Sequence, residues 1–96
     1  MSVQDINGTG KLYDADGKQV IATVTYHIWE KPRTEDSLAE WGGEFTLDHD
    51  IGAKGKHIIQ LEDGRKGTCF VKLDIQWVRG LGTAYRYSFQ GSGSLA

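Results

Sequence analysis

The densest group of polar side chains in the chain is Asp48-His49-Asp50, with His57 a short distance downstream. Imidazole nitrogens and carboxylate oxygens are ligand types that Zn²⁺ takes in proteins. Their spacing here matches no established zinc motif, and two lysines in the same segment would repel a cation. We therefore expect a solvated turn, with no metal and no cofactor. Metal binding by these four residues is kept as the weaker alternative.

The single cysteine, Cys69, is the only thiol in the chain. It falls on the apolar face of a predicted strand, where a buried thiol has little thiolate character. No serine or histidine stands in a recognised catalytic motif such as G-x-S-x-G. A small enzyme that uses the 48–57 loop is therefore the least favoured of three functional hypotheses, and we favour a protein that is not an enzyme.

Several apolar and aromatic side chains fall on the predicted outer face of the strands. Ile21, Trp29 and Phe70 point away from the predicted core, and His27 lies among them. Apolar residues gathered in a patch are typical of a protein interface, although a second core layer in a sandwich would also account for them. The leading hypothesis is a non-catalytic binding or interaction module. Its patch would contact an unknown protein partner or a second copy of the chain, as in a homodimer.

Four aromatic residues on the predicted inner faces suggest an alternative function. Tyr26, Trp77, Tyr85 and Tyr87 would surround the mouth of a barrel, where rings and hydroxyl groups together suit an amphipathic small molecule. The alternative is therefore a carrier of such a ligand. Because a barrel of this size is nearly filled by its own side chains, a surface site is favoured over a large cavity.

The elements that must position these residues are β-strands. The clearest strand covers residues 18–30, is rich in β-branched residues and alternates with a period of two. One face of this strand, and one face of a second long strand over residues 66–77, are predicted to point inward. These inward residues are Val20, Ala22, Val24, Tyr26 and Ile28 in the first strand, and Cys69, Val71, Leu73, Ile75 and Trp77 in the second.

Shorter alternating segments at residues 8–14, 41–47, 57–61 and 83–90 complete the pattern, and turn signals such as Asp-Gly separate them. No connection holds a crossover helix, and only the capping-box pattern of residues 37–40 is compatible with a helical turn. The predicted fold class is therefore all-β. We expect a small antiparallel barrel or sandwich of about six to seven strands in meander order, with at most one short helical turn.

Two similar segments stand near the ends of the chain, Gly8-Thr9-Gly10-Lys11-Leu12 and Gly91-Ser92-Gly93-Ser94-Leu95. Alternating glycines allow strongly bent strands to approach closely. We predict that the first and last strands pair and close the sheet. The alternative is that residues 91–96, like residues 1–7, form a flexible end of a single all-β domain that spans residues 1–96.

Composition limits the classes of partner. The chain has 96 residues, a formal net charge of -2 and a pI of about 5.8. Proteins that bind nucleic acid usually carry a basic surplus against the phosphates, so we expect no nucleic-acid partner. No apolar segment is long enough to cross a membrane, and the first residues lack a secretory signal. We therefore expect a cytoplasmic protein without a membrane partner, and the residues identify no family.

Overall fold

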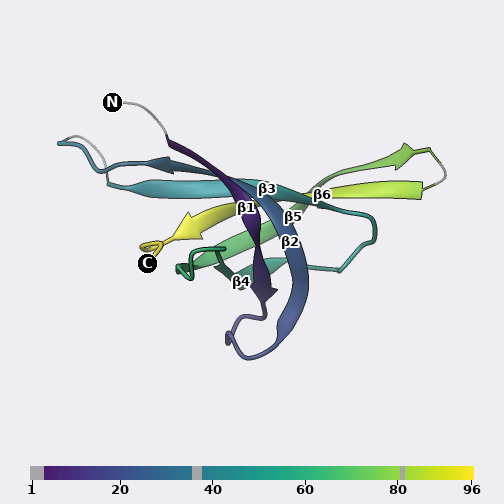
Figure 1. The fold of residues 1–96 in the computed structure, drawn as a ribbon, viewed down its shortest axis with the longest axis horizontal. Coiled ribbons are helices and arrows are strands. Elements are labelled where there is room, and N and C mark those ends of the chain that lie inside the picture. Colours follow the sequence, from purple (N-terminus) through teal and green to yellow (C-terminus); the bar gives the residue numbers. More distant parts are fainter. Residues whose placement is uncertain (1–3, 36–37, 81) are drawn as a thin grey trace.

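The computed structural model describes residues 4–35, 38–80 and 82–96. These residues form the strands β1 (Gln4–Tyr13), β2 (Val20–Lys31), β3 (Glu40–Leu47), β4 (Gly55–Gln60), β5 (Lys66–Arg79) and β6 (Gly82–Ser92). Neighbouring strands are antiparallel, and their order, β1-β2-β3-β6-β5-β4, closes on itself because β1 also pairs with β4 (Figure 1). The predicted fold class, a small all-β antiparallel barrel or sandwich, is confirmed.

No helix occurs in the described part of the chain. The helical turn considered at residues 37–40 begins at Ser37, which lies outside the described residues. Leu38 and Ala39 have no regular structure, and Glu40 is the first residue of β3. Across the described ranges, no helix is long and apolar enough to span a membrane.

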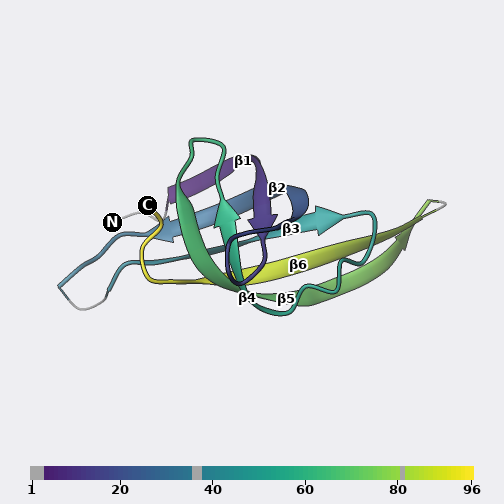
Figure 2. The same ribbon diagram turned by 90° about the horizontal axis from the view of Figure 1, so that it is seen from below.

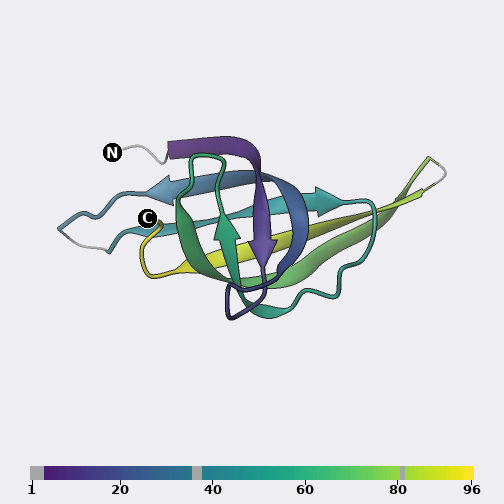
Figure 3. The ribbon, with the colours of Figure 1, turned by 60° about the horizontal axis from the view of Figure 1, so that its bottom comes forward.

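The strand order consists of two three-stranded meanders, β1-β2-β3 and β4-β5-β6, joined by the pairing of β3 with β6. The prediction that the first and last strands pair is wrong. β6 already lies between β3 and β5, and β4 closes the sheet against the C-terminal end of β1 (Figure 3). The chain end is held as well. Gly91 and Ser92 pair with β5, and Lys66 and Ala96 exchange two backbone hydrogen bonds of 2.9 Å.

The core lies inside the closed sheet. The inward positions predicted for the middle of β2 and the first half of β5 are confirmed, and the buried residues there are Val24, Tyr26, Ile28, Cys69 and Val71. Trp41 of β3 is also buried, and its ring occupies the space beside Gly67 and Gly91. A Cβ atom on either glycine would overlap the indole. These two glycines therefore make room for an aromatic ring in the core.

The inward positions predicted for the ends of the two long strands are wrong. Leu73 and Ile75 of β5 are 41% and 42% exposed, and Val20 of β2 is 45% exposed. The strand register shifts between Leu73 and Ile75, and again where β2 begins. Beyond Val71, β5 has left β4 and continues only with β6 as a two-stranded arm, residues 74–80 and 82–84 (Figure 2). On this arm Trp77 is half-buried, and its register partner Ala84 is buried.

Candidate functional site

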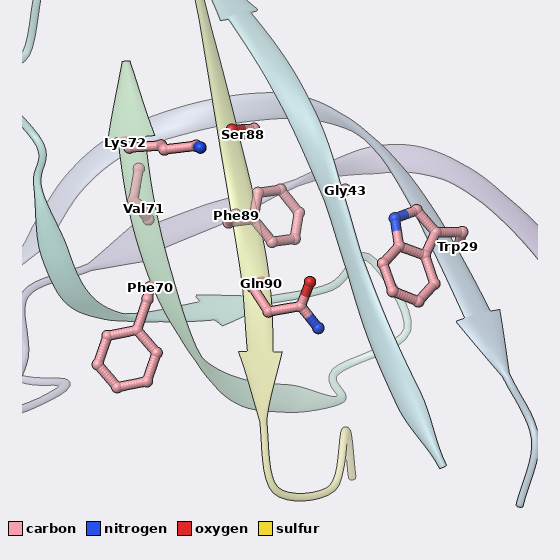
Figure 4. A pocket seen from close by; sticks show the side chains of 8 residues that line it. All are labelled: Trp29, Gly43, Phe70, Val71, Lys72, Ser88, Phe89 and Gln90. Carbon is pink, nitrogen blue, oxygen red and sulfur yellow. The ribbon is translucent and has the colours of Figure 1, made fainter. Parts of the chain in front are cut away.

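An open groove crosses the outer face of the closed sheet over β2, β3, β6 and β5 (Figure 4). It has a volume of about 520 Å³ and is lined by Trp29, Gly43, Phe70, Val71, Lys72, Ser88, Phe89 and Gln90. Trp29 and Phe70 lie at its two sides, and both belong to the outward patch predicted from the sequence. The sheet thus brings together two aromatic residues that are far apart in the chain.

Trp29 owes its position to the alternation of β2 and to a glycine on β3. It is the register partner of Gly42. A Cβ atom on Gly42 would lie 2.9 Å from Cζ2 of Trp29 and 2.8 Å from the carbonyl oxygen of Phe89. Both separations are well inside van der Waals contact, so only glycine allows the indole to lie against the sheet here. One side of the Trp29 ring is therefore supported by backbone.

Phe70 stands on the same outward row as Trp29. From β2 to β4 the register runs through Trp29, Gly42, Gln90, Phe70 and Lys56. Three strand spacings of about 4.8 Å separate the backbones of Trp29 and Phe70, which is roughly 14 Å. The Phe70 side chain is 51% exposed. Two aromatic rings therefore flank a floor that is wide enough for an extended ligand.

Polar side chains lie between the two rings. Gln90 donates a hydrogen bond from Nε2 to the backbone oxygen of Trp41 at 3.4 Å, which holds its amide group over β3. Ser88 lies one row further along β6, opposite Lys72 of β5, and Figure 4 shows the Lys72 ammonium group extending toward it. A bound molecule would meet an amide, a hydroxyl and a positive charge here. These groups can form hydrogen bonds to a ligand and neutralise a negative charge on it.

A row of charged side chains borders the groove. His27 Nε2 lies 3.3 Å from Asp5 Oδ1, and its Nδ1 lies 3.9 Å from Glu44 Oε1. Arg86 Nε lies 3.6 Å from Glu44 Oε2 and 3.3 Å from Asp74 Oδ2, although its N–H is not aligned for a hydrogen bond to either oxygen. The histidine contacts are ionic only when the ring is protonated. Exposed pairs of this kind contribute about 0–1 kcal/mol each, so they mainly offset the acidic charge beside Trp29.

The predicted outer patch is assembled only in part. Trp29 and Phe70 line one groove, and His27 lies in the charged row beside it. Ile21 is 37% exposed but lies near the other end of β2, at the register shift, and does not line the groove. The distance along β2 separates Ile21 from the other three residues.

The four aromatic residues predicted at a barrel mouth are not gathered at one opening. The Tyr26 hydroxyl accepts a hydrogen bond from the Glu62 amide at 3.0 Å, whereas the Tyr87 hydroxyl accepts one from the Ile51 amide at 3.1 Å. Ile51 precedes β4 and Glu62 follows it, so the two hydroxyls lie toward opposite ends of that strand. Trp77 lies on the β5–β6 arm and Tyr85 packs, partly buried, against the core.

The polar segment at residues 48–57 divides among different partners. Asp48 and His49 contact each other at 2.7 Å in solvent, and this hydrogen bond lowers the pKa of Asp48. Asp50 instead accepts a hydrogen bond from the buried Tyr87 hydroxyl, and His57 Nδ1 lies 3.0 Å from the Gly55 carbonyl. Within the described residues, no group of three or more His, Cys, Asp or Glu side chains is placed to hold a metal ion.

Three pKa shifts describe the interior and the segment that contacts it. Burial raises the pKa of Cys69 to about 12, so its thiol stays protonated near neutral pH. Burial also raises the pKa of Tyr87, and the hydrogen bond to Asp50 adds to this shift. The same hydrogen bond, followed by one from the Gly52 amide, lowers the pKa of Asp50. The hydrogen bonds of the Tyr87 hydroxyl to Asp50 and Ile51 tie this segment to the core.

The pattern of single strands does not identify the other residues of the groove, which are Gly42, Gln90, Ser88 and Lys72. Their one sequence signal is the Gly42-Gly43 pair inside a strand, which indicates a close approach by another group. No family model, curated protein or solved structure matches the chain. We therefore interpret the groove from its own chemistry.

Proposed function

We propose that the protein is a non-catalytic binding module and that the groove between Trp29 and Phe70 is its binding site. The observation that carries this proposal is the pair of aromatic side chains supplied by β2 and β5, with an amide and a hydroxyl between them. Aromatic rings supply contact area, and a few polar groups fix the orientation of what binds.

Two features support binding over catalysis. Cys69 is buried and protonated, and the polar side chains of the 48–57 segment contact separate partners instead of forming one cluster. The interior is occupied by packed side chains, which favours a surface site over a carrier cavity.

We also propose the cytoplasm as the location of the protein, because the one cysteine is a free thiol, as is usual in a reducing compartment.

The proposal is tested by a binding screen read out through Trp29. In a Trp77→Phe background the remaining tryptophans are Trp29 in the groove and the buried Trp41. Titration with oligonucleotides, oligosaccharides and short peptides should change the fluorescence for at least one class. Phe70→Ala should weaken that binding, whereas Ile21→Ala, an exposed residue outside the groove, should not.

Equal affinity in Phe70→Ala and Ile21→Ala would reject the groove as the site. A screen in which no class binds at millimolar concentration would also count against the proposal. Circular dichroism of each variant checks that it is folded; both replaced side chains are exposed, so we expect little loss of stability.

A second candidate function is self-association through the β5–β6 arm. Leu73 and Val78 share one face of this region and are 41% and 78% exposed, and Ile75, on the opposite face, is 42% exposed. A two-stranded ribbon is marginally stable alone in water, and exposed apolar residues on one of its faces favour an interface. Sedimentation velocity should therefore detect a species heavier than 10.6 kDa at high micromolar concentration.

The arm is tested by replacing its most exposed apolar residue. Val78→Asp should shift the protein toward the monomer, whereas Ile21→Asp on β2 should leave the distribution unchanged. A single monomeric species of the unmodified protein across the whole concentration range would reject self-association and leave the groove untouched.

A further inference from the structure

Exposed lysines are concentrated on the outer surface next to Phe70. Lys56 of β4 is the register partner of Phe70, and Lys72 lies two residues further along β5 on the same face. Lys66 of β5 and Lys11 of β1 both pair with Gln60, which lies between them on β4. The described outward residues of β4, and those of β5 as far as Lys72, include no carboxylate.

These lysines alternate with aromatic rings. Lys66 Nζ lies 5.6 Å from the centre of the Tyr13 ring, Phe70 lies beside Lys56 and Lys72, and Trp29 lies at the far side of the groove. We call Trp29, Phe70, Lys56 and Lys72 the lysine–aromatic surface, which extends from β2 over β3 and β6 to β5 and β4. Lys66, Tyr13 and Lys11 lie further around the closed sheet, toward β1.

The charges of the surface are not neutralised by the protein itself. Within the described ranges, no carboxylate lies at ion-pair distance from these four lysines. The nearby acidic side chains have other partners. Glu44 and Asp74 contact Arg86, and Glu30 and Asp63 contact Arg65. The positive charge is therefore available to an anionic ligand.

We propose, on the basis of the binding groove proposed above, that the ligand is a single-stranded nucleic acid. Such a strand presents a regular row of negative charges together with flat bases. Proteins that bind it without sequence preference combine cationic side chains along the backbone with aromatic rings on which bases stack. In a duplex the bases are stacked inside and cannot reach such rings, which excludes double-stranded nucleic acid as the preferred form.

Each part of the surface then has a role. Trp29, whose ring is supported by Gly42, and the exposed Phe70 each stack on a base. Three strand spacings separate their backbones, which leaves space between them for a further part of the strand. Gln90 and Ser88 hydrogen-bond to base edges or sugars in that space. Lys56 and Lys72 contact the phosphates.

This proposal departs from the expectation drawn from net charge. The value of -2 is a sum over the whole chain, and many of its carboxylates lie in the turns and on the β2–β3 side. A nucleic acid responds to the potential of the surface it touches, within about one Debye length of 8–10 Å. Lys56 and Lys72 therefore set the potential beside Phe70, whereas the carboxylates nearest Trp29, those of Asp5 and Glu44, contact His27 and Arg86.

The test is fluorescence anisotropy with labelled single-stranded DNA and RNA of about 12 nucleotides. At low salt we expect a Kd of roughly 1–100 µM, with an affinity that falls steeply between about 50 and 200 mM salt. Phe70→Ala should weaken binding by roughly 5- to 150-fold, the range measured for loss of one stacked base. Lys72→Gln should reduce the slope of log affinity against log salt by about 0.7. The matched control is Lys18→Gln, in the β1–β2 turn outside the surface, which should leave that slope nearly unchanged.

Competitors distinguish the remaining outcomes. If polyglutamate displaces the oligonucleotide as well as unlabelled DNA does, and Phe70→Ala has no effect, the surface binds acidic polymers by charge alone and the nucleic-acid proposal is wrong. If no oligonucleotide binds while another class in the fluorescence screen does so in a Phe70-dependent way, this proposal fails and the groove stands. If neither assay depends on Phe70, both proposals fail.

Discussion

Replacing Gly91 by alanine tests a tightly constrained contact in the core. A Cβ atom at this position would lie closer than 3.0 Å to three atoms of the Trp41 indole, a separation that side chains essentially never show. The ring cannot simply rotate away, because its Nε1 donates a hydrogen bond to the Gly93 carbonyl at 3.0 Å and the side chain is 4% exposed. Gly91→Ala must therefore displace Trp41 or bend β6.

The expected cost has two parts. Overpacking a filled core costs about 1–3 kcal/mol, and loss of one hydrogen bond adds about 0.5–1.5 kcal/mol. The reduced freedom of the unfolded chain returns about 0.4–1 kcal/mol. We expect a net loss of about 2–3 kcal/mol in the free energy of unfolding. In a domain of this size that corresponds to a fall in Tm of roughly 8–24 °C.

The assay is urea denaturation followed by circular dichroism, for Gly91→Ala in the natural chain and in a Trp41→Leu background. The smaller leucine leaves room for the new methyl group, so the cost of Gly91→Ala should fall by more than about 1 kcal/mol there. Gly64→Ala, at a positive φ of 92° in open space, should cost about 1 kcal/mol in both backgrounds. A cost of Gly91→Ala below about 0.5 kcal/mol, or an equal cost in both backgrounds, would refute the packing argument.

Three further predictions concern the interior and the segment tied to it. Tyr87→Phe leaves the Ile51 amide and Asp50 without their partner, so it should cost about 1–3 kcal/mol and speed hydrogen exchange at residues 51 and 52; unchanged exchange would contradict the assigned hydrogen bonds. The pKa of Asp50 is lower in the folded protein than its unfolded value of about 3.9, so its ionised carboxylate stabilises the fold above that pH. This contribution is lost as the pH falls through the lower pKa of the folded state. Asp50→Asn should therefore reduce the loss of stability below pH 4 in an acid titration. Cys69, whose pKa burial raises to about 12, should react with a thiol reagent at pH 8 only as fast as the protein opens; reaction at the rate of a free thiol would show that it is accessible.

The strands themselves could be predicted from local pattern. The alternation around Val24 and Ile28 identifies β2 and its inward face, and the same holds for Cys69 and Val71 in β5. A period of two with many β-branched residues indicates a strand, and burial of one face fixes which side chains point inward. These assignments therefore need no knowledge of neighbouring strands. The all-β class and the tight Asp-Gly turns follow from the same local rules.

The errors occur where the partner strand decides the outcome. Leu73 and Ile75 continue the alternation of Val71, yet they lie where β4 has ended and the register has shifted. The shift places Ile75 opposite Arg86, and therefore on the other face from Leu73, which is opposite Tyr87. Alternation along β5 indicates neither this shift nor whether another strand covers a face. The strand that closes the sheet was likewise mispredicted, because β4 and β6 are both compatible with the local pattern near β1.

The candidate site divides in the same way. Alternation along each single strand predicts that Trp29 and Phe70 point outward, because each is adjacent in sequence to residues that point inward. The strand order β2-β3-β6-β5 and the register of its three pairings bring the two rings to one groove. They also place Gly42 beneath the indole and Gln90 between the rings. Pairing between distant strands depends on contacts across the whole closed sheet, so only the tertiary structure could decide which side chains become neighbours.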